Sequence, residues 1–237
     1  MQYGEFQYLP MTPAPFLLLV GLAVGLLILI QLRILRYAYM RLGLSSGAAL
    51  LLLAGTLIGS YFNIPVAELP KGPATSAEIV EFFGMRYVVP VVARSSTIVA
   101  VNIGGALIPA VMSLYLLLRY RLLLSGTIAT AIVAFVIHAL ATPVHGVGIA
   151  VPVFAPALIS AIASFVLSRE FAPPLAYISG SLGTLIGADL LNLDKVAGLG
   201  APVASIGGAG TFDGIFLTGI LAVLMASIVS PQPRPAR

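Results

Sequence analysis

The chain has 237 residues, of which 59% are hydrophobic and 8% are charged, with a formal net charge of +4. An ordinary soluble domain carries about 25% charged residues, so this composition excludes a soluble fold and makes lipid the expected solvent. No cysteine is present, which excludes disulfides, thiolate metal sites and cysteine catalysis. The small net charge gives no case for nucleic acid as a partner.

Long apolar runs in chain order predict helices that cross a bilayer, each of which needs about 20 mostly apolar residues. The runs lack the period-two alternation that is typical of membrane barrels. We therefore expect an all-α integral membrane protein with about seven transmembrane helices. The predicted spans are 15–34, 46–64, 96–118, 122–141, 149–168, 172–193 and 203–230.

The longest loop, 65–95, lies between the second and third predicted spans. Its apolar residues Ile79, Val80, Phe82 and Phe83 form either a short interfacial helix or an ordinary loop packed on the bundle. The segment after Ser230, 231–237, is rich in proline and arginine, and we expect it to be disordered.

Basic residues predict the orientation of the spans. If the spans alternate, one side of the membrane receives Arg33, Arg36, Arg41, Arg119, Arg121, Arg169, Arg234 and Arg237. The positive-inside rule makes that side cytoplasmic. We therefore expect a multi-pass protein of the cell's inner (plasma) membrane, with the N-terminus outside and the C-terminus in the cytoplasm.

Two short motifs occur twice, in the same order. Gly55–Gly59 (GTLIG) recurs as Gly183–Gly187, and Asn102–Ala106 (NIGGA) is echoed by Ser205–Ala209 (SIGGA). The two copies of each motif fall on spans that run in the same direction. This predicts a duplicated membrane unit whose copies are parallel.

The duplication predicts one membrane domain, 1–237, in two three-helix repeats. The first repeat covers 15–118, a linker helix covers 122–141, and the second repeat covers 149–230. Parallel repeats are a known transporter plan with sites at the repeat interface. The arrangement is similar in architecture to the SWEET sugar exporters, although none of their sequence motifs is present.

Asp189 and Asp213 occur in the second copy only. Ionisable residues inside a membrane are costly and are functional candidates by default. Two close carboxylates in a low dielectric share a proton, which suits a proton relay, a cation site or a diaspartyl hydrolase. The alternative for Asp189 is a structural cap, or an ion pair near the surface with Lys195, Arg86 or Arg94.

Gly210-Thr211-Phe212-Asp213 resembles the Gly-x-Gly-Asp motif of presenilin-type intramembrane aspartyl proteases. Phe212 occupies the place of the second glycine, and Asp189 follows Ala188 where that family has tyrosine. The resemblance implies that one aspartate acts as a base on water while the other acts as an acid.

Other polar residues fall in the outer half of the predicted spans. His138 and His145 are metal candidates together with the acids, since imidazole and carboxylate suit zinc and similar ions; hydrogen-bonded or interfacial histidines are the alternative. Asn102 and Asn192 line a pathway or bond across helices. No cofactor is expected.

Four segments resemble an uncharacterised prokaryotic integral-membrane family that is known only as a domain of unknown function. These segments are Phe83–Tyr87, Asn102–Pro109, Gly183–Leu193 and Pro202–Gly219. The resemblance implies a polytopic membrane protein and no established activity.

Our leading hypothesis is a small transporter, linked to protons or another cation. Asp213 and Asp189 bind the cation, and Asn102 and Asn192 line its pathway. The alternatives are an intramembrane diaspartyl protease that uses both aspartates as catalytic residues, and a noncatalytic scaffold. The expected partners are the bilayer and a small solute, an ion or a membrane-embedded substrate, and an oligomer is left open.

Overall fold

The computed structural model describes residues 25, 28, 31–70, 78–82, 85–89, 96–144, 148–152, 154–196, 203–208 and 214–230. Helices dominate these residues, as the composition predicts. After the helical segment 31–41 they are α2 (Ser46–Gly59), η1 (Ile103–Leu107), α3 (Ile108–Arg119), α4 (Leu123–Leu140), α5 (Ala155–Leu167), α6 (Ala172–Thr184), η2 (Leu185–Asp189), η3 (Leu190–Asn192), α7 (Leu193–Val196) and α8 (Gly214–Val229). Of these, η1 and η2 are π-helical and η3 is a 3₁₀ turn.

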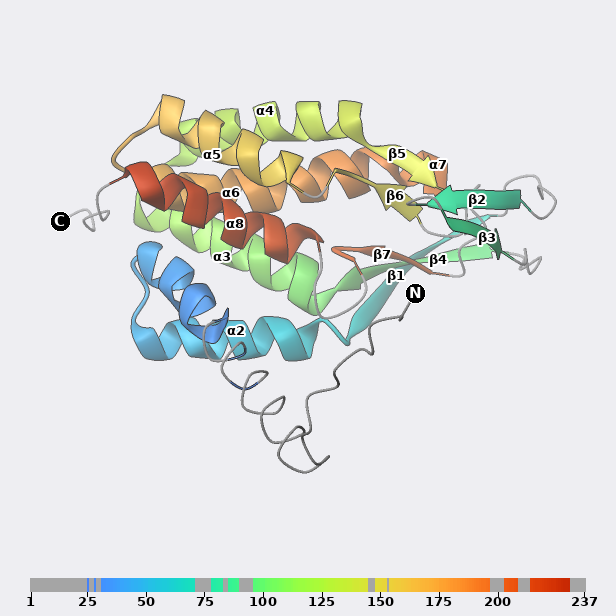
Figure 1. Cartoon of the computed structure of the whole chain (residues 1–237), viewed down its shortest axis with the longest axis horizontal. Helices are drawn as coiled ribbons and strands as arrows, with labels where there is room; N and C mark the ends of the chain where they lie inside the picture. Colours follow the sequence, from blue (N-terminus) through green and yellow to red (C-terminus); the bar gives the residue numbers. More distant parts are fainter. Residues whose placement is uncertain are drawn as a thin grey trace, which may run out of the picture.

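Strands gather at one end of the helices (Figure 1). They are β1 (Asn63–Pro70), β2 (Glu78–Phe82), β3 (Met85–Val89), β4 (Ser96–Asn102), β5 (Thr142–Val144), β6 (Gly148–Ala150) and β7 (Val203–Ile206). The largest sheet has the order β1-β4-β7, in which β4 pairs antiparallel to β1 and parallel to β7. The hairpins β2–β3 and β5–β6 are separate two-stranded sheets.

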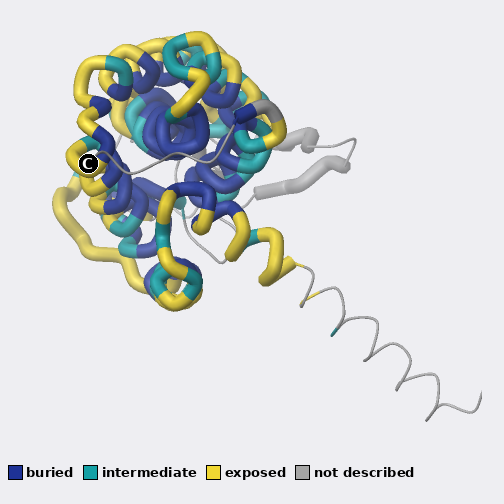
Figure 2. The backbone as a smooth tube through the Cα atoms, turned by 90° about the vertical axis from the view of Figure 1, so that its left-hand side faces the viewer, coloured by how far each residue is buried: buried dark blue, intermediate teal, exposed yellow. Residues whose placement is uncertain are grey.

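Helix α6 is the centre of the bundle. All of its residues except Leu182 are buried, and Figure 2 shows a buried helix encircled by the others. Small residues allow this close packing: a Cβ on Gly180 would touch Ser160 of α5 and Ala222 of α8, and one on Gly183 would lie 2.6 Å from Val133 of α4.

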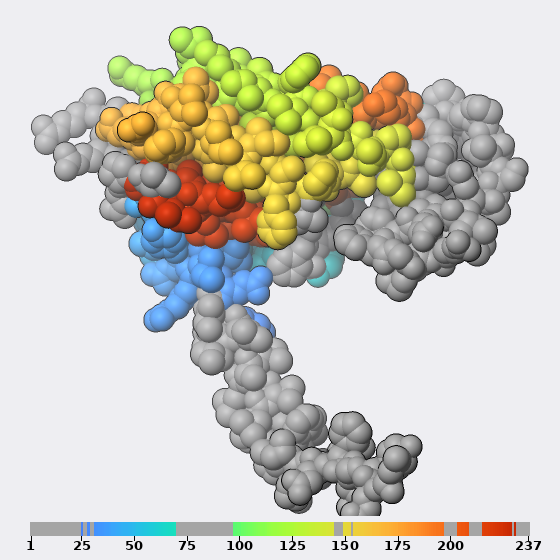
Figure 3. Space-filling model, turned by 45° about the horizontal axis from the view of Figure 1, so that its top comes forward, coloured from blue at the N-terminus to red at the C-terminus, as the bar shows by residue number. Residues whose placement is uncertain are grey.

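The outside of the bundle is apolar. Leu124 and Val166 are 76% exposed, Phe135 is 75% exposed and Ile228 is 85% exposed. These side chains belong to α4, α5 and α8, which lie next to one another on the face shown in Figure 3. Large apolar residues spread over a whole surface are atypical of a soluble monomer.

Two described helices, Leu123–Leu140 and Ala172–Val196, are long and apolar enough to cross a membrane. A third span results if Gln31–Arg41 and Ser46–Gly59, which meet at 115°, are counted as one. The apolar helices Ile103–Arg119, Ala155–Leu167 and Ile215–Ile228 are shorter. The prediction of helices that can cross a membrane is thus confirmed for two or three, and the number seven stays a prediction.

The all-α prediction was wrong where apolar segments form strands. The predicted spans 96–118, 149–168 and 203–230 each begin in a strand, and the span 46–64 ends in one. A continuous apolar run cannot be assigned to helix or strand by periodicity, and β-branched residues such as Val99 favour strands.

The predicted loop 65–95 also contains strands. An interfacial helix at Ile79–Phe82 was wrong, because these residues pair with Met85–Val88 as a β-hairpin. β-Branched and aromatic residues, which favour strands, make up more than half of this hairpin's strand residues. The strand Glu78–Phe82 is also too short for two turns of helix.

The first predicted span ends later than expected. The helix continues from 31 to Arg41 and then turns sharply at Gly43, whose φ of 80° favours glycine. The Tyr120 hydroxyl fills the space beside this glycine and donates a hydrogen bond to Leu42 O at 3.0 Å. Most of the predicted span 15–34 and the segment 231–237 lie outside the described residues.

Candidate functional site

Three stretches of irregular backbone meet where the bundle joins the sheet β1-β4-β7. They are the π-helical turns η1 and η2 and the glycine turn Gly207–Gly208 that follows β7. π-Helical turns are rare and frequent at functional sites. This junction is therefore the candidate functional site among the described residues.

Asp189 ends η2 and is partly buried. Its Oδ2 accepts a hydrogen bond from the backbone N–H of Gly207 at 2.8 Å. Gly207 and Gly208 have φ values of 91° and 76°, in the left-handed region that glycine adopts without strain. The bond ties the end of the α6 segment to the chain that leads into α8.

Gly207 also packs closely on η1. A Cβ on Gly207 would lie 2.6 Å from the backbone N of Ala106 and 2.7 Å from the carbonyl C of Gly105. Only a glycine can bring this turn so near the π-helical backbone. The second copy of the Gly-Gly motif is thus in contact with the first.

Asn102 is fully buried and caps η1. Its Oδ1 accepts from Gly105 N–H at 2.7 Å, while its Nδ2 donates to Ser60 O at 2.8 Å and to Asn63 Oδ1 at 3.1 Å. Every one of these partners is in the first repeat. The side chain predicted to line a pathway therefore holds the end of α2, β1 and η1 together.

Asn63 and Ser205 extend this network toward solvent. The Ser205 hydroxyl lies 2.6 Å from Asn63 Oδ1 and 2.5 Å from Gly208 O. Asn63 is exposed and Ser205 is half-buried. The sequence predicts neither residue as part of the ion pathway, although Asn63 falls with Asn102 and Asn192 in the outer half of the predicted spans. The signal for Ser205 is the echo, which aligns it with Asn102.

Asn192 is also fully buried. Its Nδ2 donates to Gly187 O at 2.9 Å and to Ala188 O at 3.0 Å, and its Oδ1 accepts from Lys195 Nζ at 2.7 Å. These bonds attach the Asn192 side chain to two backbone carbonyls of the π-helical turn η2. Asn192 therefore stabilises the backbone that carries Asp189.

The predicted histidine site stays a prediction, because the described residues contain only part of it. His138 lies near the end of α4, where its buried Nδ1 has no hydrogen-bond partner. Within the described ranges no three His, Asp or Glu residues come together as metal ligands. Asp213, His145 and Arg94 lie outside the described residues, as does the side chain of Arg86.

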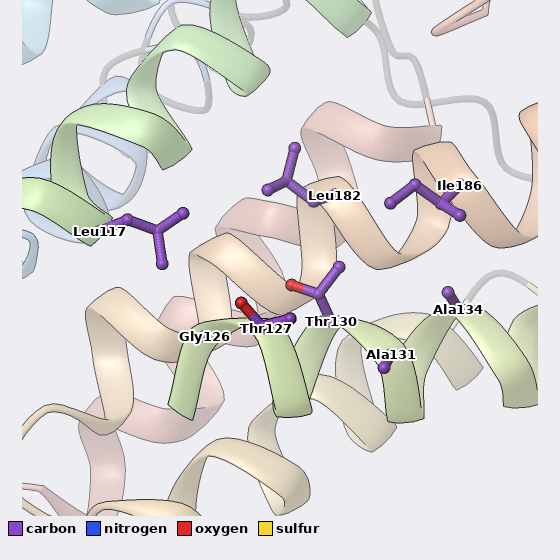
Figure 4. A pocket seen from close by; sticks show the side chains of 8 residues that line it. All are labelled: Leu117, Gly126, Thr127, Thr130, Ala131, Ala134, Leu182 and Ile186. Atoms are coloured by element: carbon purple, nitrogen blue, oxygen red, sulfur yellow. The ribbon is translucent and has the colours of Figure 1, made fainter. Parts of the chain in front are cut away.

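A separate, apolar groove of about 340 Å³ lies between α3, α4 and the segment formed by α6 and η2. Figure 4 shows Leu117, Leu182 and Ile186 along it, with Gly126 and Thr130 of α4. It has almost no polar lining and offers no group for binding an ion. The junction, rather than this groove, has the chemistry of a site.

The junction combines one carboxylate with neutral oxygens and backbone donors. Such a set of hard oxygen ligands suits alkali and alkaline-earth cations rather than soft metals. A proton can occupy the same carboxylate.

The chain matches the family described as "Protein of unknown function (DUF1614)" over residues 57–225, and it belongs to that family. The predicted membership of an uncharacterised family is confirmed. No curated protein and no solved structure matches the chain, so the similarities to SWEET exporters and presenilin-type proteases stay predictions.

Proposed function

We propose that this member of the DUF1614 family is a small multi-pass membrane transporter, linked to protons or another cation, with Asp189 at its ion site. The observation that carries the proposal is the 2.8 Å hydrogen bond from Gly207 N–H to Asp189 Oδ2. It joins the π-helical turn at the end of the α6 segment to the glycine turn that follows β7, so the α6 segment loses regular helical geometry at this bond. Transporters typically bind ions at such discontinuous helices.

The direction of the helices supports a membrane orientation. Helices α2, α3, α4, α5, α6 and α8 run alternately between two ends of the bundle (Figure 1). One end holds the sheet, and the other holds the helix ends near Arg41, Arg119, Arg121 and Arg169. By the positive-inside rule the arginine end is cytoplasmic. The ion site and the sheet are then at the outer side, in an inner membrane crossed seven times.

Competition for Asp189 supplies a coupling step. Its carboxylate either accepts the Gly207 N–H or is engaged by a proton or cation. A bound proton or cation thus weakens the hydrogen bond between Asp189 of η2 and the glycine turn. The turn can then change conformation at Gly207 and Gly208. Asn102 and Asn192 keep the flanking backbone in place, and Asp213 is the second acid of the site on sequence grounds.

The parallel pairing of β4 and β7 supports a site between two repeats. Each strand leads through a Gly-Gly step toward a helix, α3 after β4 and α8 after β7. Ala100 lies opposite Ser205 and Val101 opposite Ile206 in the parallel register. Sites at repeat interfaces are typical of transporters built this way.

Transport is tested with the full chain in liposomes. Radiolabelled sodium uptake and the pH of the vesicle interior are followed under a pH or voltage gradient, with protein-free liposomes as the baseline. We expect flux above this baseline, and at least a tenfold loss of flux in Asp189→Asn, since the carboxylate is the ion ligand. Asp194→Asn, an exposed acid at the same end, keeps the wild-type flux.

Two outcomes would overturn the proposal. The first is wild-type protein that carries neither sodium nor protons above the baseline, which favours a scaffold. The second is wild-type flux in both Asp189→Asn and Asp213→Asn, which removes the acids from the mechanism.

A further inference from the structure

An arginine occupies a backbone position that usually takes glycine. Helix α3 ends in a Schellman motif, in which Leu122 N–H donates to Leu117 O at 2.9 Å and Arg121 N–H donates to Leu118 O at 3.4 Å. Arg121 has a φ of 53°, and among the described residues no other non-glycine residue has a positive φ. This left-handed conformation is costly for a residue with a side chain. A strained residue of this kind is a candidate for function.

The apolar groove between α3, α4 and the segment formed by α6 and η2 begins beside this turn. Leu117, which accepts the hydrogen bond of the motif, lines the groove and packs on Gly126 of α4. From Gly126 the groove follows α4 to Ala134, over about 12 Å at helical rise (Figure 4). Thr127 and Ala131 line it and are exposed, so the groove is open to the surroundings of the bundle.

One polar group in this groove has no partner. Thr130 lines the groove and is 9% exposed, and its Oγ1 is buried without a hydrogen-bond partner in the described part of the chain. Figure 4 shows this oxygen on the side of α4 that faces Leu182. The hydroxyl of Thr127, in contrast, already donates to Leu123 O at 2.7 Å. A buried hydroxyl without a partner is unfavourable, so an occupant that supplies an acceptor oxygen stabilises this arrangement.

We propose that the groove binds one glycerophospholipid with an anionic headgroup. Its phosphate contacts the exposed guanidinium of Arg121, an ester carbonyl accepts the Thr130 hydroxyl, and an acyl chain lies along Leu182 and Ile186. Arginine is well suited to phosphate, and basic pockets between membrane helices bind anionic headgroups.

The order of these groups along the groove is the order within such a lipid. The charge lies at the α3–α4 turn, and Thr130 lies about two turns of helix beyond the start of α4 at Leu123. The apolar wall of Leu182 and Ile186 extends further toward η2. The volume of about 340 Å³ is within the range of about 300–1,000 Å³ that is usual for small-molecule sites. This inference goes beyond the proposed transport and does not depend on it.

Lipid binding is measured on the full chain in a neutral detergent. Phosphatidylglycerol is titrated against phosphatidylcholine with the same acyl chains, and native mass spectrometry counts the lipid molecules that each chain retains. The thermal midpoint is followed by circular dichroism in the same titrations, since a ligand of the folded state raises it. Glycerol phosphate, which has the charged group without the acyl chains, is the third ligand.

We expect phosphatidylglycerol to bind about fivefold more tightly than phosphatidylcholine. Arg121→Gly should lose this preference, although without lipid it is at least as stable to heat as the wild type, because glycine adopts a φ of 53° without strain. A loss of binding at undiminished stability cannot result from misfolding. Arg169→Gln changes an exposed arginine at the same end of the bundle and should keep the preference.

The groove itself is tested by three further variants. Thr130→Val removes the unpaired hydroxyl and should weaken the binding of both lipids about threefold or more, because both carry ester carbonyls. Thr127→Val is the matched control, whose hydroxyl is already bonded within α4, and it should bind both lipids as the wild type does. Ala131→Phe fills the open side of the groove and should prevent lipid binding.

Equal binding of the two lipids, or equal losses in Arg121→Gly and Arg169→Gln, overturns the proposal because the phosphate is then not at Arg121. A wild-type response to phosphatidylglycerol in Ala131→Phe places the lipid outside the groove. A midpoint that rises equally with glycerol phosphate removes the acyl chain from the site. A dimer that retains no lipid assigns the groove to a second copy of the chain, which also overturns the proposal.

Discussion

Gly104 lies so close to α2 that a Cβ on it would be 2.2 Å from the carbonyl O of Thr56 and 2.4 Å from Ser60 N. Thr56 belongs to the first GTLIG motif and Gly104 to the NIGGA motif. The motifs of the first copy therefore pack on each other. In the second copy Gly187 packs on α4 instead. A Cβ on Gly187 would lie 2.4 Å from the carbonyl O of Ala134.

Gly104→Ala should lower the free energy of unfolding by about 3 kcal/mol, because the methyl group meets backbone that cannot move away. Gly55→Ala in the same contact region is the control. A Cβ there would lie 3.8 Å from Ile108, so we expect a change of less than about 1 kcal/mol. Titration of the helical signal with SDS measures both. Equal effects at the two glycines would contradict the close approach.

Gly207→Ala should destabilise the chain by about 2 kcal/mol or more, since φ is 91° and a Cβ would meet η1. It should also lower the cation flux of the proposed transporter, because the turn donates the hydrogen bond to Asp189. Gly47→Ala is the matched control: nothing lies within 4 Å of a Cβ there, so we expect a change within about 1 kcal/mol. Unaltered stability of Gly207→Ala would argue against the left-handed turn.

Arg41→Met should lower the free energy of unfolding by about 3 kcal/mol. Arg41 is 7% exposed, and its Nη2 donates to the carbonyls of Ser227 and Ser230 at the C-terminal end of α8, where a positive charge is favourable. Arg36→Met, an exposed arginine of the same helix, should change stability by less than about 0.5 kcal/mol. SDS titration measures the free energy of unfolding of both variants. Similar losses would show that the buried hydrogen bonds of Arg41 do not stabilise the fold.

The absence of cysteine makes the proposed orientation testable by labelling. Ala67→Cys is exposed on β1, and Glu170→Cys is exposed at the opposite end of the bundle. In intact cells a membrane-impermeant maleimide should label Ala67→Cys only, and Glu170→Cys should react after permeabilisation. The reverse pattern would invert the orientation and place the ion site in the cytoplasm.

Several features of the fold follow from composition and spacing. The low charge content predicts apolar helices, which the described residues confirm, whereas the orientation that the basic residues predict stays a prediction. The strands were missed because Ile98, Val99 and Val101 continue an apolar run into η1 without a break in hydropathy. Their pairing depends on β1 and β7, which are remote in the chain.

For the candidate site, the sequence identified Asp189, Asn102 and Asn192 as unusual, because polar groups in apolar segments require partners. It did not separate their roles. Asn102 and Asn192 turn out to be buried with their amides bonded to backbone, whereas Asn63 and Ser205 acquire their significance only from contact across 142 residues. Long-range contacts of this kind leave no local pattern.

The sequence by itself determined an apolar helical membrane-type chain, a repeated glycine pattern and an acid in the second copy, because these depend on composition and local periodicity. The tertiary structure decided that the glycines serve as close contacts, that β4 and β7 pair as parallel strands, and that Asp189 is held by Gly207. Those outcomes depend on the distances between segments that fold together, which spacing along the chain does not encode.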